Sequence, residues 1–133
     1  MATKAETAIE RFRAVVGKSD GYGDWIEVDQ DRINLFADAT LDHQFIHVDP
    51  EKSAELSPYK TTIAHGFLTL SLLPHLTASI APSDPQAYDG VVMGVNYGLD
   101  KVRFPSPVPV DSRVRAERTL MEADLKDPNT IQT

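Results

Sequence analysis

The chain has 133 residues, 41% of them hydrophobic, a formal net charge of −7 and no cysteine. This length suits one compact domain over residues 1–133. An acidic chain of this size is a poor general binder of nucleic acid or of anionic membranes. Without cysteine it has no disulfide, no Cys-ligated metal and no thiol nucleophile. No signal-peptide core or membrane-spanning stretch is visible, so we expect a soluble, cytoplasmic protein.

The first half of the chain predicts mainly helices. Helical spacing of apolar residues, and aspartates placed as N-caps, predict helices over residues 5–16, from Asp29 to about residue 38, and over residues 50–56. A polar–apolar alternation predicts a short strand over residues 24–28. Residues 39–48 lack a regular period, so we expect an irregular loop there.

The segment Ile63–Ile80 predicts one long helix. Its apolar positions wrap most of the way round a helical wheel, which indicates a buried helix rather than a surface one. Pro74 removes one amide donor and should kink this helix.

Beyond residue 81 the apolar period changes to two, which predicts strands. We expect strands over residues 91–104, with a bulge at 98–100, over residues 114–120, and over residues 130–133 after a turn at 127–129. Helices first and consecutive strands later make an α+β pattern. In this pattern an antiparallel sheet wraps around the central apolar helix.

Asp42 and His47 are the first candidate chemical pair. Their separation of five residues would part them on a helix or a strand, so only an irregular loop can bring them together. A carboxylate beside an imidazole can act as an acid–base pair, and each group shifts the pKa of the other. The alternative is that Asp42 ends a helix and His47 is a semi-buried histidine without a catalytic role.

The start of the apolar helix, Thr61–Leu68, is the second candidate. Amides at a helix N-terminus carry partial positive charge, and Gly66 lets a ligand approach the backbone closely. Such a place can hold a developing oxyanion. An ordinary helix start with a packing glycine is the alternative.

Three segments together resemble the MaoC-like dehydratases, also called (R)-specific enoyl-CoA hydratases, and within them the nodulation-protein-N-like branch. Leu41–Asp49 resembles the hydratase motif Gly-Asp-x-Asn-Pro-Ile-His-x-Asp, with Gln-Phe in place of Asn-Pro as in this branch. Ile63–Leu68 resembles the second motif of the family, and Asn96–Pro105 a strand typical of the branch. The resemblance covers about residues 22–125, with the motifs in the family's order.

The resemblance implies a hot-dog fold and a homodimer, or a higher homo-oligomer, with acyl-thioester tunnels at or near the subunit interface. Asp42 and His47 would be the catalytic dyad that adds water to a trans-2-enoyl thioester of CoA or acyl carrier protein, or dehydrates a (3R)-hydroxyacyl thioester. The Gly66 amide would hold the thioester oxygen. Lys101 and Arg103 would contact CoA phosphates, unless they are solvated charges. No metal and no cofactor are expected, and base and acid are not assigned within the dyad.

Two departures from the family pattern bear on this expectation. Leu41 stands where the family usually has glycine; if that position needs a positive φ, leucine costs about 1–2 kcal/mol. Family members also usually continue for two more strands, so the sheet would lack its last strands. We expect assembly with a neighbouring chain to compensate.

Three other functions remain open. His43 and His47 have the spacing of a zinc-binding H-E-x-x-H helix, although Gln44 replaces the glutamate and no third ligand is obvious. A thioesterase on the same fold would release free thiol instead of consuming the enoyl group. A non-catalytic acyl-CoA binding subunit would bind the thioester without turnover.

Overall fold

The computed structural model describes residues 1–133, which form two compact units. Unit 1 comprises Met1–Gly23, Thr77–Leu99 and Ala116–Thr133, and unit 2 comprises Asp24–Leu76 and Asp100–Arg115. Each unit joins segments that are distant in the sequence, and the single domain expected over the whole chain stays a prediction. No helix combines the length and apolar character that crossing a bilayer demands.

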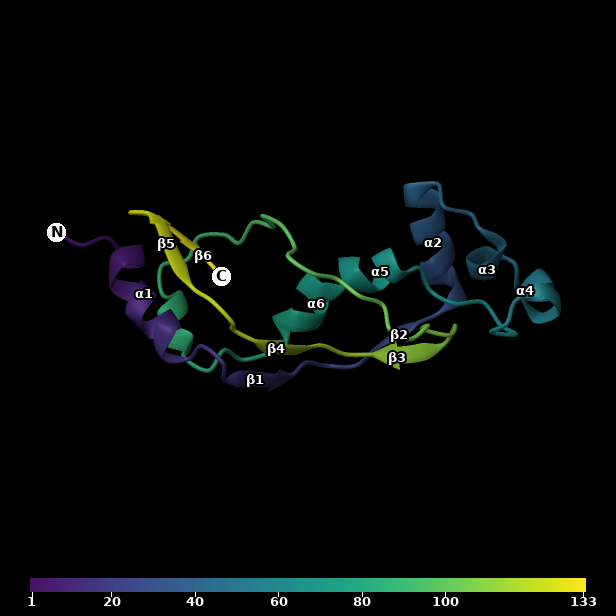
Figure 1. Ribbon diagram of the computed structural model, residues 1–133, viewed down its shortest axis with the longest axis horizontal. Coiled ribbons are helices and arrows are strands. Elements are labelled where there is room, and N and C mark those ends of the chain that lie inside the picture. The colour runs from purple at the N-terminus through teal and green to yellow at the C-terminus, as the bar shows by residue number, and fades with distance from the viewer. The chain divides into compact units, whose positions relative to one another are not determined.

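An N-terminal helix is followed by two short strands, then by a run of helices, and then by four more strands (Figure 1). The helices are α1 (Lys4–Ala14), α2 (Gln30–Thr40), α3 (Phe45–Val48), α4 (Pro50–Leu56), α5 (Gly66–Ser71), α6 (Leu73–Ala78) and the 3-10 helix η1 (Pro85–Tyr88). The strands are β1 (Ser19–Tyr22), β2 (Ile26–Val28), β3 (Ser112–Val114), β4 (Glu117–Thr119), β5 (Asp124–Asp127) and β6 (Thr130–Gln132). They form three antiparallel pairs, β1 with β4, β2 with β3 and β5 with β6.

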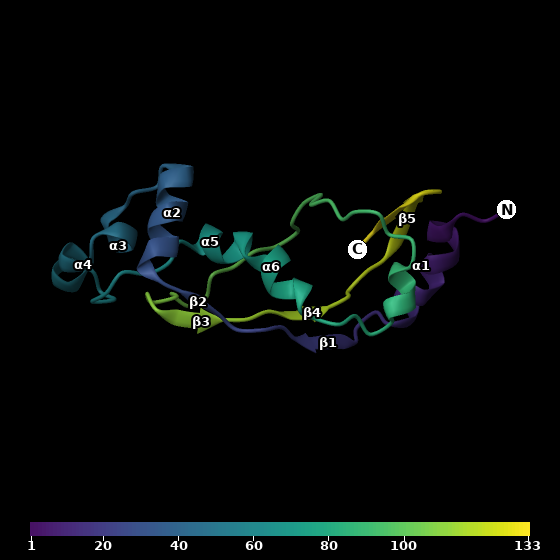
Figure 2. The same ribbon diagram turned by 180° about the vertical axis from the view of Figure 1, so that it is seen from behind.

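In unit 1, α1 lies beside the β5–β6 hairpin, as both Figure 1 and Figure 2 show. Thr3 and Glu6 form a capping box that satisfies the first amides of the helix. Ile9 and Phe12 point into a small core with Ala87 and Ala123. The helix predicted over residues 5–16 and the strand predicted at the C-terminus are therefore confirmed.

In unit 2, two aspartates begin the helices on either side of the segment that holds Asp42 and His47. Asp29 accepts a hydrogen bond from the Arg32 amide at the start of α2, and Asp49 accepts one from the Lys52 amide at the start of α4, each at 2.9 Å. Both predicted helices are confirmed, because local side-chain caps stabilise a helix start without help from distant residues. α2 extends past residue 38 to Thr40.

The core of unit 2 joins α2 to the strand before it and to α5. Val28 and Ile33 are completely buried, and they cluster with Ala64 and Leu68. β2 pairs with β3, so the strand predicted over residues 24–28 is confirmed. The loop expected over residues 39–48 is only partly right, because its last residues form the short helix α3.

The prediction of one long buried helix over Ile63–Ile80 is wrong in two respects. The segment forms two short helices, α5 and α6, that are interrupted at Leu72. Pro74 has no N–H to offer the carbonyl four residues back, so the hydrogen-bond ladder fails there. The segment is also not buried all round, since Phe67 is 68% exposed and Leu73 40% exposed.

The strand predicted over residues 91–104 is also wrong, as is its bulge at residues 98–100. No β-pairing is recorded for this segment, although its alternating apolar residues suit a strand. A strand is stable only with a neighbour that pairs its backbone groups, and no other segment of this chain does so. Its valines, methionine and tyrosine are therefore exposed: Val91, Val92, Met93, Val95 and Tyr97. In place of the single strand expected over residues 114–120 there are two, β3 and β4.

Candidate active site

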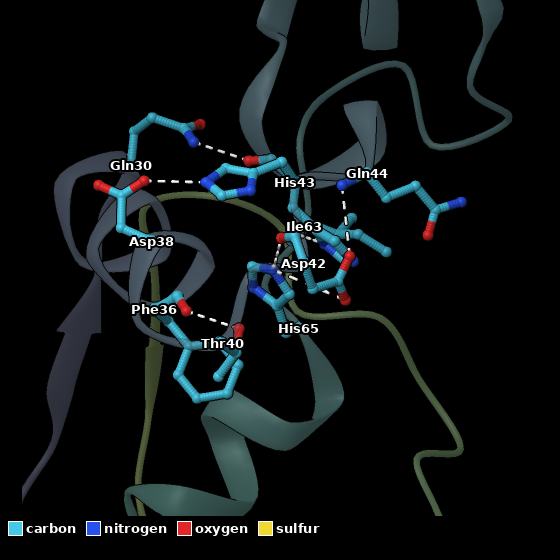
Figure 3. A network of polar contacts seen from close by, with 10 residues as sticks. Gln30, Phe36, Asp38, Thr40, Asp42, His43, Gln44, Ile63 and His65 are labelled. Carbon is cyan, nitrogen blue, oxygen red and sulfur yellow. Dashed lines mark hydrogen bonds and ion pairs between the residues drawn. The ribbon is translucent and has the colours of Figure 1, made fainter.

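Every predicted site residue lies in unit 2. Figure 3 shows the centre of the site, where the loop after α2 meets the segment before α5. The loop begins at Leu41, which has φ 65° and ψ 18° and ends α2 in the left-handed conformation. This turn places Asp42 beside the residues that precede α5. The Asp42 carboxylate accepts a hydrogen bond from the Gln44 amide at 3.3 Å and stays half exposed.

His47 lies on α3 and is 7% exposed. Its Nδ1 lies 2.7 Å from the main-chain oxygen of Ile63. A carbonyl oxygen can only accept, so Nδ1 carries the proton and donates it, which leaves Nε2 as an acceptor. Burial lowers the pKa of His47 below its ordinary value, an effect that the hydrogen bond to Ile63 and the charge of Asp42 partly oppose. The neutral imidazole is thus favoured.

The structure brings Asp42 and His47 together with a third residue, His65. One ligand atom from each of the three side chains lies within 4.8 Å of the others. Asp42 faces solvent, whereas both histidines are buried. The arrangement therefore exposes one carboxylate at the edge of a buried pair of imidazoles, which is a geometry suited to moving a proton.

A glutamine braces this group from α2. Gln30 donates from its side-chain amide to the main-chain oxygen of His47 at 2.7 Å, and its own oxygen accepts from the Thr62 hydroxyl at 2.6 Å. The Ile63 amide donates to the Ile46 carbonyl at 2.9 Å. These bonds tie α3 to the segment before α5, so His47 is held from both sides. The sequence offers no periodic signal for Gln30, because its role depends on tertiary contacts.

His65 was missed as a functional candidate by the sequence reasoning, although it lies in the second motif directly before Gly66. It is 3% exposed, and its Nε2 lies 3.0 Å from the main-chain oxygen of Asp42 (Figure 3). Its ring stacks on that of His47, with centroids 3.8 Å apart and planes at 23°. The available signal was its place in the second motif, directly before the candidate Gly66.

Gly66 is the first residue of α5, where amides have no acceptor within the helix. A Cβ added here would lie 2.8 to 2.9 Å from ring carbons of Phe104. No residue other than glycine fits without displacing that ring. The sequence suggested that Gly66 lets a ligand approach the backbone closely. In the structure the group that approaches it is the Phe104 ring of the protein itself.

Lys101 and Arg103 are exposed and belong to the same segment as Phe104. Arg103 donates to the main-chain oxygen of Val102 at 2.8 Å. Phe104, the next residue after Arg103, lies against Gly66 at the start of α5. The two cations are open to an anion, and neither forms part of the group around His47.

The zinc hypothesis finds no support in the placement of His43. Its Nε2 pairs with the Asp38 carboxylate at 2.9 Å, and it is not one of the three residues whose ligand atoms converge. His47 and His65 are stacked almost parallel, whereas ring lone pairs point outward within the ring planes. Two such rings do not direct their nitrogens at one ion with the tetrahedral geometry of zinc.

Known proteins resemble this chain over most of its length. The model of the family described as MaoC like domain matches residues 11–133. The 3-hydroxyacyl-thioester dehydratase Z of Mycobacterium tuberculosis (strain ATCC 25618 / H37Rv) is 50% identical over 125 residues, covering 94% of this chain and 79% of the relative. Nodulation protein N of Rhizobium leguminosarum bv. viciae is 51% identical over 118 residues, covering 89% of this chain and 71% of the relative.

Among solved structures, the R-hydratase PhaJ1 from Pseudomonas aeruginosa, unliganded, superposes with a TM-score of 0.60 at 24% sequence identity. The match covers 80% of this chain and 61% of that one, so the chain spans less than two thirds of the hydratase. This likeness shows the fold, and the predicted α+β hot-dog class is confirmed.

Proposed function

The chain belongs to the MaoC-like domain family, and from that premise we propose that it adds water reversibly to a trans-2-enoyl thioester, giving a (3R)-hydroxyacyl thioester. The enzyme class, a dehydratase or hydratase, follows from 50% identity with a relative named 3-hydroxyacyl-thioester dehydratase Z. The (R) configuration of the product and the enoyl-CoA substrate are our proposal. They are supported by the name of the R-hydratase that shares the fold, while the Asp42–His47 pair supports the addition of water.

The observation that carries the proposal is the pair formed by Asp42 and His47. Their nearest ligand atoms are no more than 4.8 Å apart, a gap that one water molecule hydrogen-bonded to both groups can span. His47 presents Nε2 as an acceptor because Nδ1 is occupied by the Ile63 carbonyl. The Asp42 carboxylate is exposed and can orient the same water.

In this mechanism the water oxygen forms the bond to the β-carbon while its proton passes to His47 Nε2. The imidazolium so formed returns a proton to the α-carbon, and Asp42 stabilises its charge meanwhile. The net change is the addition of one water molecule, and both side chains regain their starting states. Dehydration follows the same steps in reverse. A general acid–base pair of this kind typically contributes about 10²–10⁴-fold to the rate.

The remaining predicted residues have supporting roles in the proposal. The Gly66 amide holds the thioester oxygen as it gains enolate charge, because the first amides of α5 lack an acceptor within the helix. Lys101 and Arg103 bind CoA phosphates, since both are exposed cations in the segment that leads to Phe104.

A homodimer is part of the same proposal. The exposed apolar segment around Val95 and Tyr97 has the alternation of a strand but no partner within the chain. Pairing with a second copy of the chain would satisfy its backbone and cover its apolar side chains. The cytoplasmic location stays a prediction of the sequence.

A direct assay tests the function and separates it from its competitors. Purified protein is given trans-2-enoyl-CoA substrates of increasing chain length, and loss of enoyl absorbance and release of free thiol are followed together. We expect the absorbance to fall without thiol release, and the product to be the (3R) alcohol by chiral chromatography. Thiol release without hydration would identify a thioesterase instead. Binding without either change would identify a non-catalytic acyl-CoA binding protein.

A further inference from the structure

His65 is not a member of the proposed dyad, but it contacts both Asp42 and His47. Its Nε2 lies 3.0 Å from the Asp42 main-chain oxygen, so Nε2 carries a proton and donates it. The same nitrogen is 4.0 Å from the Asp42 carboxylate. The His65 ring also stacks on the ring of His47, with 3.8 Å between the ring centroids. One buried side chain thus contacts the backbone of one dyad member and the ring of the other.

Packing alone does not explain a histidine at this position. With Nε2 used as a donor, Nδ1 is left as an acceptor, and it is buried without any hydrogen-bond partner. A buried polar atom without a partner costs free energy. A phenyl ring would fill the same space, including the contact with Phe36 at a centroid distance of 4.9 Å, without this cost. What histidine adds over phenylalanine is the donor that holds Asp42.

We propose that His65 is a positioning residue of the dyad: its Nε2–H holds the Asp42 main-chain carbonyl, and its stacked ring holds the His47 imidazole at a constant distance from the Asp42 side chain. The inference rests on the proposed hydratase function. Asp42 needs such a tether because it follows the left-handed Leu41 in a solvent-exposed loop. Its carboxylate is held otherwise only by the 3.3 Å bond from the Gln44 amide.

The variant His65→Phe removes the donor and keeps a ring, whereas His65→Gln keeps a donor and removes the ring. We expect H65F to lower kcat about 10- to 100-fold, because small misplacements of reacting groups cost rate on this scale. KM should change little, since His65 is only 3% exposed and so offers little surface to a substrate. The melting temperature should not fall, because the unpaired Nδ1 is gone. H65Q should lose less kcat than H65F.

The matched control is His43→Gln. His43 is the neighbour of Asp42 in sequence, but it is exposed and pairs with Asp38. H43Q should keep the kcat and KM of the parent protein. A merely structural role for His65 would instead lower stability in H65F and leave kcat per folded molecule unchanged.

Two further readouts connect His65 to the dyad. In the Asp42→Asn background H65F should cause little additional loss, since residues that act through one another are not additive. The acid limb of kcat/KM should move to higher pH in H65F. The groups that face His47 are Asp42 and His65, and His65 lowers the pKa of His47 whereas Asp42 raises it.

The outcomes separate this proposal from the function on which it rests. If the parent protein hydrates enoyl-CoA, an H65F variant with parental kcat, or an additive cycle with Asp42→Asn, overturns the positioning role. If H65F does not fold, His65→Leu, which also lacks the donor, replaces it, and an unchanged kcat in that variant overturns the positioning role. If the parent protein shows no hydration, the proposed function fails, and nitrogen NMR of the His47 ring decides about His65. If the titration and the tautomer of His47 are identical in the parent and in H65F, the contact with His65 is refuted. A change in either of them supports the contact.

Discussion

The site segment Asp42–Gly66 and the segment Val91–Phe104 differ in whether their groups find partners within the chain. In the first, His47 is held by Ile63 and Gln30, and nearly every buried polar atom has a partner within unit 2. In the second, Val92 is 95% exposed and Tyr97 86% exposed, and the backbone pairs with no strand. The candidate site is therefore held together by contacts within the chain, whereas one apolar segment has no pairing partner in the chain.

The largest effect is expected when a side chain of the proposed dyad is replaced. Asp42→Asn and His47→Gln should each lower enoyl-CoA hydration by at least about 100-fold, the lower limit for a general acid–base group. Both changes keep the size of the side chain, so the fold should persist. Turnover is measured on protein whose circular dichroism matches the parent. Near-parental turnover in either variant would refute the dyad.

The second segment is tested by its association. We expect light scattering to give about twice the chain mass of 14.7 kDa. Val95→Asp should raise the dimer dissociation constant about 100-fold, because two valines are lost per dimer at about 1.5 kcal/mol each. Met121→Asp changes an equally exposed apolar residue outside the segment and serves as the control. An active parent protein at the mass of one chain would contradict the dimer.

The pH dependence of the site follows from the burial of His47. Burial lowers the pKa of His47, so the neutral imidazole persists below its ordinary range near pH 6.5. The acid limb of kcat/KM should therefore inflect below about pH 6.5, with about a tenfold loss per pH unit beyond it. An inflection above that value would show that another group controls the rate.

The same shift has a consequence for stability. The unfolded chain binds a proton at His47 at higher pH than the folded chain does, so unfolding is favoured as the pH falls through about 6.5 toward the folded pKa. Stability is fully retained above the ordinary pKa. Chemical denaturation of the parent and of His47→Gln over this range isolates the contribution, because the variant lacks the titrating group.

The fold and the site were predictable to different extents. Helices that begin at Asp29 and Asp49 follow from side-chain caps within a few residues, and they were predicted correctly. The strand over residues 91–104 was not, because pairing depends on residues far away or on another chain. Asp42 and His47 were found through the motif that carries them. Gln30 and His65 act through contacts that link distant segments. No local pattern distinguishes Gln30, and the motif that contains His65 does not reveal its contacts with Asp42 and His47.

The close approach at Gly66 gives a smaller effect. Gly66→Ala would place a Cβ 2.8 Å from the Phe104 ring, so we expect a loss of about 1–3 kcal/mol in the free energy of unfolding. In a Phe104→Ala background the sign should reverse, because alanine is the better helix former once the ring is absent. Thermal or denaturant unfolding of the four proteins gives the cycle. An equal loss in both backgrounds would place the strain elsewhere.

The smallest effect is expected at Leu41, which ends α2 and directly precedes Asp42. Its φ of 65° lies in the left-handed region, where a side chain costs about 1–2 kcal/mol. The leucine is 80% exposed, so its removal sacrifices little burial. Leu41→Gly should therefore raise the free energy of unfolding by about 1 kcal/mol, after the greater chain entropy of glycine is subtracted. The melting temperature should rise by a few degrees.

Two further substitutions show whether strain at Leu41 is the cause. Leu41→Ala keeps a Cβ and should gain nothing, while Leu41→Asn should gain part of the effect because asparagine tolerates this conformation. If the family glycine sets the position of Asp42, L41G should also raise turnover and leave the pH profile unchanged. Equal melting temperatures for L41G and L41A would mean that the turn carries no strain. The position of Asp42 would then depend on its hydrogen bonds with His65 and with the Gln44 amide.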